Sequence, residues 1–243
     1  DPVNWSCAYD AFLNLMWNLW VQSGPHCFER IIDSSVEMNH LVSLFSQVDQ
    51  GTWSLEAVRC AIRERLALRG GTMFPLYGHV SIAVDNVFGA FLSGTSPSVS
   101  LTRVPACCSN CGCMGPTTEA IPSPIIWESQ AVEDSANRHP APLPMSIVVS
   151  DLLRNVFSVR CTVCRHHIAS EMIFSDVPNL LVVNLNRRTT AHVPLYIEPT
   201  LLIPTTMPTQ SLLRIYGIVY WGDNHFTTQL VDRNGNVWYN DGA

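Results

Sequence analysis

The chain has 243 residues, of which 47% are hydrophobic and 14% are charged, and its formal net charge is −6. This composition predicts a globular protein with enough apolar residues for a full core. The excess of acidic residues gives no positively charged surface of the kind that binds nucleic acid. No apolar stretch is long enough to span a membrane, since even the run from Phe12 to Val21 contains Asn14 and Asn18. We therefore expect no nucleic-acid partner and no membrane span.

The first predicted element is an amphipathic helix that begins near Cys7. Its apolar residues recur at i, i+3, i+4 and i+7, as Phe12, Leu15, Met16 and Leu19. Asn4 and Ser6 supply capping oxygens ahead of the helix. A cysteine at a helix N-terminus feels the positive end of the helix dipole, which favours the thiolate. Cys7 is thus a candidate nucleophile, and an ordinary buried thiol is the alternative reading of this stretch.

Further helices follow, and then strands. Apolar spacing predicts helices over 36–48 and 55–68, the second capped by Ser54 and ended by Gly70-Gly71. Residues 80–92 are mixed in pattern, and 99–104 alternate like a strand. The chain therefore begins with a helical lobe and continues into strands.

Six of the nine cysteines cluster in the middle of the chain. Cys108/Cys111 and Cys161/Cys164 form two C-x-x-C pairs, the spacing of a closed, tetrahedral structural zinc site. Four thiolates leave no open coordination position, so we assign this zinc no catalysis. Alternative ligands lie beside these pairs, namely Cys107, Cys113, His166 and His167. Paired C-x-x-C spacing also favours a reducing compartment over a disulfide framework.

The middle and C-terminal parts alternate between irregular and strand-like segments. Residues 128–145 are rich in Ser, Ala, Pro and charge, which predicts a flexible insertion, and 146–157 suit a short helix. Strands are expected over 180–185, 201–204, 212–221, 226–231 and 237–239. The first of these strands is nearly all apolar, which predicts a central place in a sheet.

A histidine and a carboxylate fall on neighbouring C-terminal strands. His225 begins one strand, Asn234-Gly235 marks a turn, and Asp241 ends the next. A cysteine peptidase needs a nucleophile, a base and a group that orients the base, and Cys7, His225 and Asp241 can fill these roles. A plain two-residue turn would put Asp241 opposite Thr228, about 10 Å from His225, so a bulge or longer loop must adjust the register.

The order of these parts resembles the ubiquitin-specific protease (USP) family. The family's cysteine box corresponds to residues 4–10, its zinc knuckles to the two C-x-x-C pairs, its palm strand to 177–188 and its histidine box to 212–241. The resemblance implies an α+β fold, that of a papain-like cysteine peptidase in one catalytic domain over 1–243. It divides the chain into a helical thumb (1–98), zinc-binding fingers (99–175) that contain the insertion, and a β-sheet palm (176–243).

The resemblance also implies an activity, which is removal of ubiquitin or a ubiquitin-like modifier by cleavage after the modifier's C-terminal glycine. Pro2 stands where the family has its oxyanion asparagine, and Asn4 with the backbone N–H of Cys7 can take that place. Asp10 and the Asn224-His225-Phe226 stretch are similar to a divergent SUMO isopeptidase of the family, so SUMO is a second possible modifier. The expected setting is intracellular, cytoplasmic or nuclear. The alternative is a catalytically weak module that binds the modifier without cleaving it.

Overall fold

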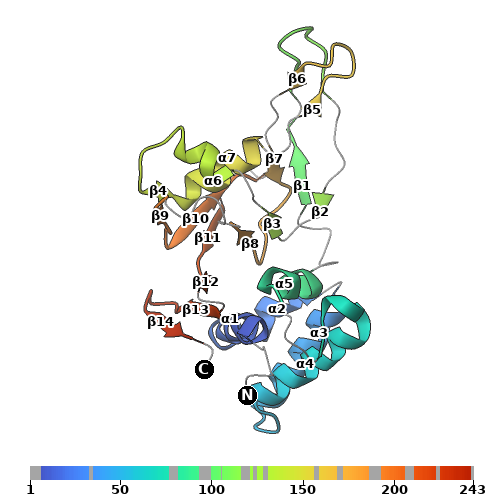
Figure 1. Ribbon diagram of the computed structural model, residues 1–243, viewed down its shortest axis with the longest axis vertical. Helices are drawn as coiled ribbons and strands as arrows, with labels where there is room; N and C mark the ends of the chain where they lie inside the picture. Colours follow the sequence, from blue (N-terminus) through green and yellow to red (C-terminus); the bar gives the residue numbers. More distant parts are fainter. Residues whose placement is uncertain are drawn as a thin grey trace. The chain divides into compact units, whose positions relative to one another are not determined.

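The structure is a computed structural model that describes residues 7–32, 35–76, 82–92, 100–104, 106–115, 121–122, 125–127, 131–155, 159–168, 172–185, 193–205, 211–222 and 225–241 (Figure 1). The chain separates into two compact units. Unit 1 combines Asp1–Ser96 with Tyr216–Ala243, and unit 2 is Pro97–Ile215. No helix among the described residues is both long enough and apolar enough to cross a membrane.

Unit 1 contains the predicted helical lobe and the last three strands of the chain. Its helices are α1 (Cys7–Ser23), α2 (Pro25–Ile32), α3 (Val36–Asp49), α4 (Leu55–Gly70) and α5 (Val84–Leu92), with a 3₁₀ turn at Gly71–Met73. The helices predicted over 36–48 and 55–68 are confirmed. Ser54 Oγ accepts a hydrogen bond from the backbone N–H of Ala57 at 3.1 Å, so this residue caps α4 as its sequence position indicated.

The core of unit 1 forms around the apolar stripe of α1. Phe12, Met16 and Leu19 are buried, as the helical spacing predicted. The Phe12 ring lies 5.0 Å from the ring of Phe88 and 4.6 Å from that of Phe91, both on α5. Aromatic pairs at such separations add to the stabilisation that burial provides. The mixed segment near residue 80 therefore contributes a helix to the same core as α1.

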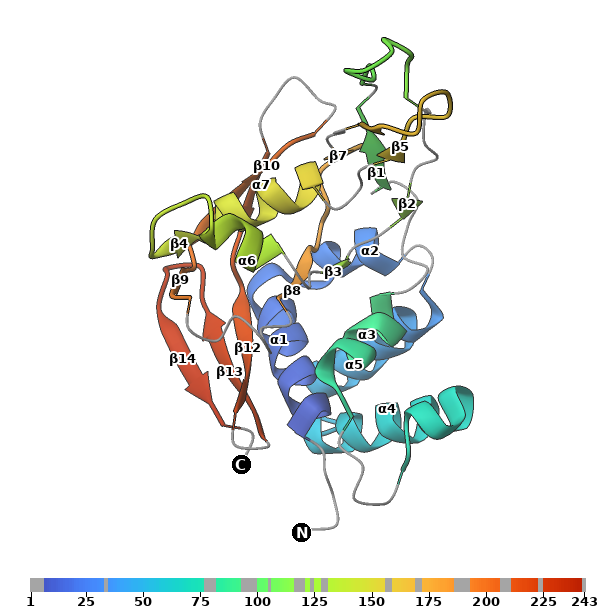
Figure 2. The ribbon, with the colours of Figure 1, turned by 45° about the horizontal axis from the view of Figure 1, so that its top comes forward.

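A three-stranded antiparallel sheet packs against α1 in unit 1 (Figure 2). Its strands are β12 (Gly217–Gly222), β13 (His225–Val231) and β14 (Val237–Asn240), with β13 in the centre. Gly217 is needed at the contact, because a Cβ there would lie 2.1 Å from Leu15 Cδ2 and 2.7 Å from the Gln229 carbonyl oxygen. The sheet and the helix thus approach each other closely.

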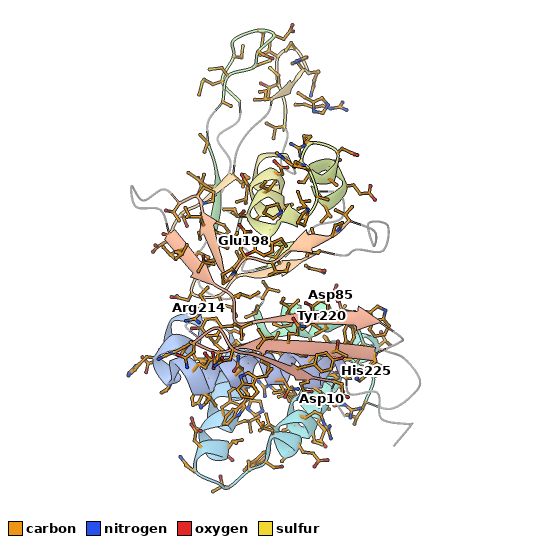
Figure 3. The ribbon with its side chains drawn as sticks, turned by 90° about the vertical axis from the view of Figure 1, so that its left-hand side faces the viewer. Asp10, Asp85, Glu198, Arg214, Tyr220 and His225 are labelled. Carbon is orange, nitrogen blue, oxygen red and sulfur yellow. The ribbon has the colours of Figure 1, made fainter. Side chains whose placement is uncertain are left out.

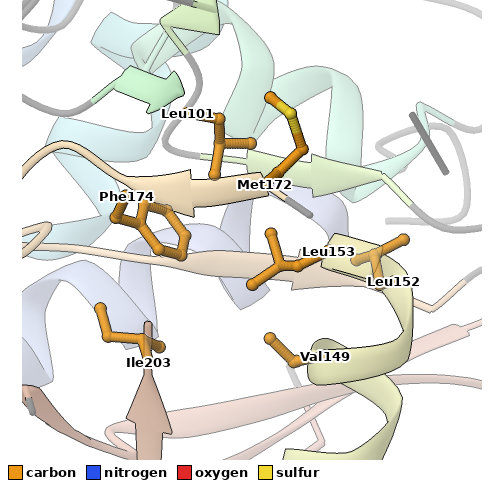
Figure 4. Packing of buried hydrophobic residues seen from close by; sticks show 7 residues of the cluster. All are labelled: Leu101, Val149, Leu152, Leu153, Met172, Phe174 and Ile203. Carbon is orange, nitrogen blue, oxygen red and sulfur yellow. The ribbon is translucent and has the colours of Figure 1, made fainter. Parts of the chain in front are cut away.

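Unit 2 is a set of short strands with two helices. Its helices are α6 (Ala131–Ala136) and α7 (Met145–Asn155), and its strands are β1 (Ser100–Arg103), β2 (Ile121–Pro122), β3 (Ile125–Trp127), β4 (Leu143–Pro144), β5 (Val159–Arg160), β6 (His167–Ile168), β7 (Met172–Phe174), β8 (Val182–Asn184), β9 (Leu195–Tyr196), β10 (Thr200–Ile203) and β11 (Ser211–Arg214). One hydrophobic cluster joins α7 to β1, β7 and β10, and it consists of Leu101, Val149, Leu152, Leu153, Met172, Phe174 and Ile203 (Figure 4).

Two features of unit 2 differ from the sequence expectations. Within the insertion expected over 128–145, Ala131–Ala136 form α6 and Leu143–Pro144 form β4, and Val132 and Leu143 are buried in a common cluster. The apolar strand β8 pairs, within the described residues, with β3 alone, so a central position in a sheet is not observed. Residues 176–215 of the expected palm belong to unit 2, and its last three strands belong to unit 1.

Candidate catalytic and metal-binding sites

Cys7 is the first residue of α1, and its thiol is free and half-buried. The helix dipole stabilises negative charge within the first turn, so this position suits a reactive thiolate. Asn4, the candidate for the oxyanion hole, lies outside the described residues. The described structure therefore places the candidate nucleophile but not its oxyanion partner.

His225 is the first residue of β13, and its ring contacts the end of the neighbouring strand. His225 Nε2 forms a hydrogen bond with the backbone carbonyl oxygen of Asp241. The register pairs Thr228 with Asn240, so Asp241 lies one residue closer to His225 than a plain two-residue turn would bring it. Continued by one residue, this register sets Asp241 opposite Thr227 and on the same face as His225.

A five-residue loop between β13 and β14 produces this register. The Asp232 carboxylate accepts hydrogen bonds at 2.8 Å from the backbone N–H groups of Asn234 and Asn236. Hydrogen bonds from the Asn236 side chain first, and then from backbone N–H groups, lower the pKa of Asp232 below its ordinary value. Gly235 adopts φ +85°, a conformation that favours glycine. These contacts define the loop that aligns Asp241 with His225.

Contacts along α1 show that Cys7 and His225 lie at the same end of unit 1. Leu15 sits at the level of Gln229, and Gln22 Nε2 donates to the Val231 carbonyl oxygen at 3.0 Å, so helix and strand run in the same direction. Cys7 precedes Leu15 by eight residues, or about 12 Å of helix. His225 precedes Gln229 by four residues, or about 13 Å of strand.

These nearly equal rises bring the first residue of α1 level with the first residue of β13. Figure 3 agrees, because it shows Asp10, one helical turn after Cys7, at the same end of the sheet as His225. Cys7 and the His225–Asp241 pair thus lie at the same end of one unit, although Cys7 and Asp241 lie near opposite ends of the chain.

Asp10 ties the first turn of α1 to α4. Its Oδ1 pairs with Arg59 Nη1 at 3.2 Å, and the two side chains are only 16% and 20% exposed. Asp10 Oδ2 is buried and has no hydrogen-bond partner among the described residues. Arg59 also pairs with Glu56 at 3.2 Å, but that carboxylate is 78% exposed. The buried pair holds the turn that carries Cys7 against the helical lobe.

We expect Asp10→Asn to lower the free energy of unfolding by about 1–2 kcal/mol, because it removes the charge that compensates the mostly buried Arg59 guanidinium. Glu56→Gln is the matched control, since it removes the other carboxylate of the same arginine, and we expect it to cost less than about 0.5 kcal/mol because that carboxylate is solvated. Urea unfolding curves of both variants measure the difference. Equal costs for the two changes would contradict a special role for the Asp10 pair.

Four cysteine sulfurs converge in unit 2. The Sγ atoms of Cys108, Cys111, Cys161 and Cys164 all lie within 4.8 Å of one another. The Cys108–Cys164 and Cys111–Cys161 sulfur pairs are each 3.5 Å apart. Four thiolates at 2.3 Å from a tetrahedral zinc would be about 3.8 Å from each other. The cluster therefore has the ligand type, number and spacing of a closed metal site.

The two C-x-x-C pairs share the same backbone conformation and hydrogen bonding, which was not predicted from the sequence. Cys108 N donates to the Cys113 carbonyl, and Cys161 N donates to the His166 carbonyl, both at 2.8 Å. The residue after each second cysteine has positive φ, +71° at Gly112 and +62° at Arg165. In the sequence, this conformation is indicated by Gly112, the glycine directly after the second cysteine of the first pair.

Hydrogen bonds favour the thiolate at Cys161 and Cys164, whereas side-chain hydrogen bonds with the neighbouring sulfurs help to raise the pKa of Cys111. The Asn110 side chain, followed by the His166 backbone N–H, lowers the pKa of the Cys164 thiol to about 6. Backbone N–H groups of Cys164 and Val163 also hold the pKa of Cys161 below its ordinary value. Of the alternative ligands, Cys107 instead donates to Met114 Sδ at 3.2 Å, and His166 and His167 are exposed outside the cluster. The four cysteines predicted as ligands are thus the ones whose sulfurs lie together in the structure.

Comparison with solved structures gives a likeness over nearly the whole chain. A chain of the SAGA DUB module Ubp8/Sgf11/Sus1/Sgf73 bound to monoubiquitin matches with a TM-score of 0.57 and 10% sequence identity. The match covers 99% of this chain and 62% of that chain, so this chain spans less than two thirds of its structural neighbour. No protein-family model and no curated protein matches the chain. At this identity the likeness shows the fold alone, and it supports the expected USP-like mixture of helices and sheets.

Proposed function

We propose that the chain is a cysteine isopeptidase that removes ubiquitin or a ubiquitin-like modifier such as SUMO from proteins. The observation that supports the proposal is that Cys7, at the start of α1, and His225, whose ring contacts Asp241, lie at the same end of one unit of the fold. The fold likeness to a module bound to monoubiquitin supports a modifier as the substrate. The free thiol of Cys7 suits a reducing, intracellular setting.

In the proposed reaction, Cys7 acts as the nucleophile and His225 as the proton carrier. The Cys7 thiolate attacks the carbonyl carbon of the modifier's C-terminal glycine, and the bond to the lysine ε-nitrogen breaks as His225 gives that nitrogen a proton. His225 then takes a proton from water, which hydrolyses the thioester and releases the modifier and the free thiol. Asp241 orients His225, and the Cys7 backbone N–H with Asn4 receives the oxyanion.

Zinc is the proposed metal of the four-cysteine cluster, where it has a structural role. Bound by Cys108, Cys111, Cys161 and Cys164, it would hold together two knuckles that are separated by about fifty residues of chain. Four protein ligands complete the tetrahedral shell, so the reaction needs no zinc-bound water.

Propargyl probes built on ubiquitin and on SUMO test the proposed activity. We expect at least one probe to form a covalent adduct with the wild-type chain, detected as a mass increase of one modifier. Cys7→Ala should form none, because the probe reacts only with the activated nucleophile. Cys60→Ala is the matched control, since Cys60 is a free and exposed thiol on α4, and its adduct should form at the wild-type rate.

The probes also separate the alternatives. An adduct that survives Cys7→Ala, or no adduct with either probe, would overturn the isopeptidase proposal. In the second case, binding of unmodified ubiquitin or SUMO to the wild-type chain would identify the binding module instead. The probe that reacts faster names the preferred modifier.

A further inference from the structure

The second zinc knuckle carries a surface of exposed arginine and histidine side chains. Arg160, Arg165, His166 and His167 are all exposed, and no Asp or Glu occurs from residue 152 to residue 170. This is unusual in a chain whose formal net charge is −6. We call Arg160, Val163, Arg165 and His167 the knuckle surface.

The pairing of β5 with β6 sets which side chains face outward. Val159 lies opposite Ile168, and both pack with the buried cysteines. Arg160 lies opposite His167, on the other face of the hairpin. Directly opposite side chains are about 5 Å apart, so the Arg160 guanidinium and the His167 imidazole lie beside each other on this face. The knuckle therefore places two hydrogen-bond donors together on its outer face, where a carboxylate can accept from both.

Arg165 occupies a backbone position that does not suit its side chain. Its φ of +62° lies in the left-handed region, and the corresponding residue of the first knuckle is Gly112 with φ +71°. Glycine adopts this conformation without steric cost, whereas an arginine there is disfavoured. The shape of the knuckle explains the positive φ, but it gives no reason for a guanidinium at this position. A role for the side chain outside the fold would explain it.

Two further features of the knuckle surface are typical of a protein-binding surface. Val163, between the two knuckle cysteines, is 68% exposed. Within the described residues, no carboxylate forms an ion pair with Arg160 or Arg165. Arginines beside an exposed apolar residue are typical of protein interfaces.

We propose that the knuckle surface binds an acidic segment of a partner protein, which is a function separate from the proposed isopeptidase chemistry. The guanidinium fork matches a carboxylate in bidentate geometry, and all 14 basic residues of this chain are arginines. An acidic protein segment is favoured over nucleic acid because a net charge of −6 repels a long polyanion. Val163 would contact an apolar side chain within the acidic segment.

Fluorescence anisotropy with a labelled peptide of alternating glutamate and leucine tests the proposal. We expect saturable binding to the wild-type chain, and at least fivefold weaker binding when glutamine replaces every glutamate of the peptide. Arg160→Glu and Arg165→Glu should each weaken binding at least fivefold, because each removes a charge-assisted contact and adds repulsion. Arg233→Glu, an equal charge change at an exposed loop of unit 1, should change binding less than twofold.

Arg165→Gly distinguishes binding from folding. Glycine suits φ +62°, so this variant should keep its zinc content and its thermal midpoint while it loses at least fivefold in affinity. Wild-type affinity in Arg165→Gly would overturn the proposal, as would equal binding of the glutamine peptide or no binding of the glutamate peptide at millimolar concentration. Equally tight binding of a labelled oligothymidine would show a general polyanion site and would also overturn it.

Discussion

Replacing His225 by alanine is expected to slow hydrolysis of a modifier–aminomethylcoumarin conjugate by at least about 10³-fold, which corresponds to about 4 kcal/mol of transition-state stabilisation. The imidazole is the only group in the proposed mechanism that both removes and supplies a proton, and its loss leaves the thiol without a base. Initial rates at saturating substrate measure the effect.

His26→Ala is the matched control for this experiment. His26 lies on α2 of the same unit, and its side chain is 88% exposed. We expect it to keep the wild-type rate. If His225→Ala retained more than a tenth of the wild-type rate with an unchanged thermal midpoint, His225 would not be the base.

Asp241→Asn should have a smaller effect than His225→Ala. The hydrogen bond that the structure records for the ring goes to the backbone carbonyl oxygen of Asp241, and a side-chain substitution leaves that oxygen in place. We therefore expect a rate loss of about 10–10²-fold, below the roughly 10⁴-fold typical of a triad whose acid alone orients the histidine. An Asp241→Asn loss as large as that of His225→Ala would show that the carboxylate, and not the backbone contact, orients the ring.

Removal of the metal is expected to unfold the knuckles of unit 2. We expect one zinc per purified chain, and metal chelation should release it with faster amide hydrogen exchange over 106–115 and 159–168. Among the described residues, the cluster of the two knuckles has three buried members, Cys108, Cys161 and Ile168, and four partly buried residues pack against them. Structural zinc sites of this kind contribute about 10–16 kcal/mol of apparent binding free energy at neutral pH, so the metal dominates the local stability.

Cys164→Ser should lose most of the zinc, because its sulfur belongs to the cluster and is stabilised as a thiolate. Cys107→Ser is the matched control, since that thiol contacts Met114 and lies outside the cluster, and it should keep a full equivalent of zinc. Mass spectrometry of the two purified variants measures the zinc content of each. Full zinc occupancy in Cys164→Ser, or zinc loss in Cys107→Ser, would contradict the assigned ligand set.

Local features of the fold were predictable from the sequence because their causes are local. The helices α1, α3 and α4 follow from apolar residues at helical spacing, and Ser54 and Gly70 mark the ends of α4. The four-cysteine cluster was predictable because C-x-x-C spacing brings two sulfurs together within one turn. The composition of 128–145 predicts flexibility, but composition does not reveal that Val132 and Leu143 pack into a common cluster.

The sequence by itself determined the candidate residues, namely a cysteine at a helix start, a histidine at a strand start, an aspartate on the next strand and two cysteine pairs. Only the tertiary structure decided that His225 meets Asp241, because the register depends on the loop held by Asp232. Only the tertiary structure also brought the C-terminal strands to α1, through contacts such as Asn18 with Tyr216, which are 198 residues apart. Such pairings depend on packing between segments that are far apart in the sequence, and local sequence patterns do not reveal this packing.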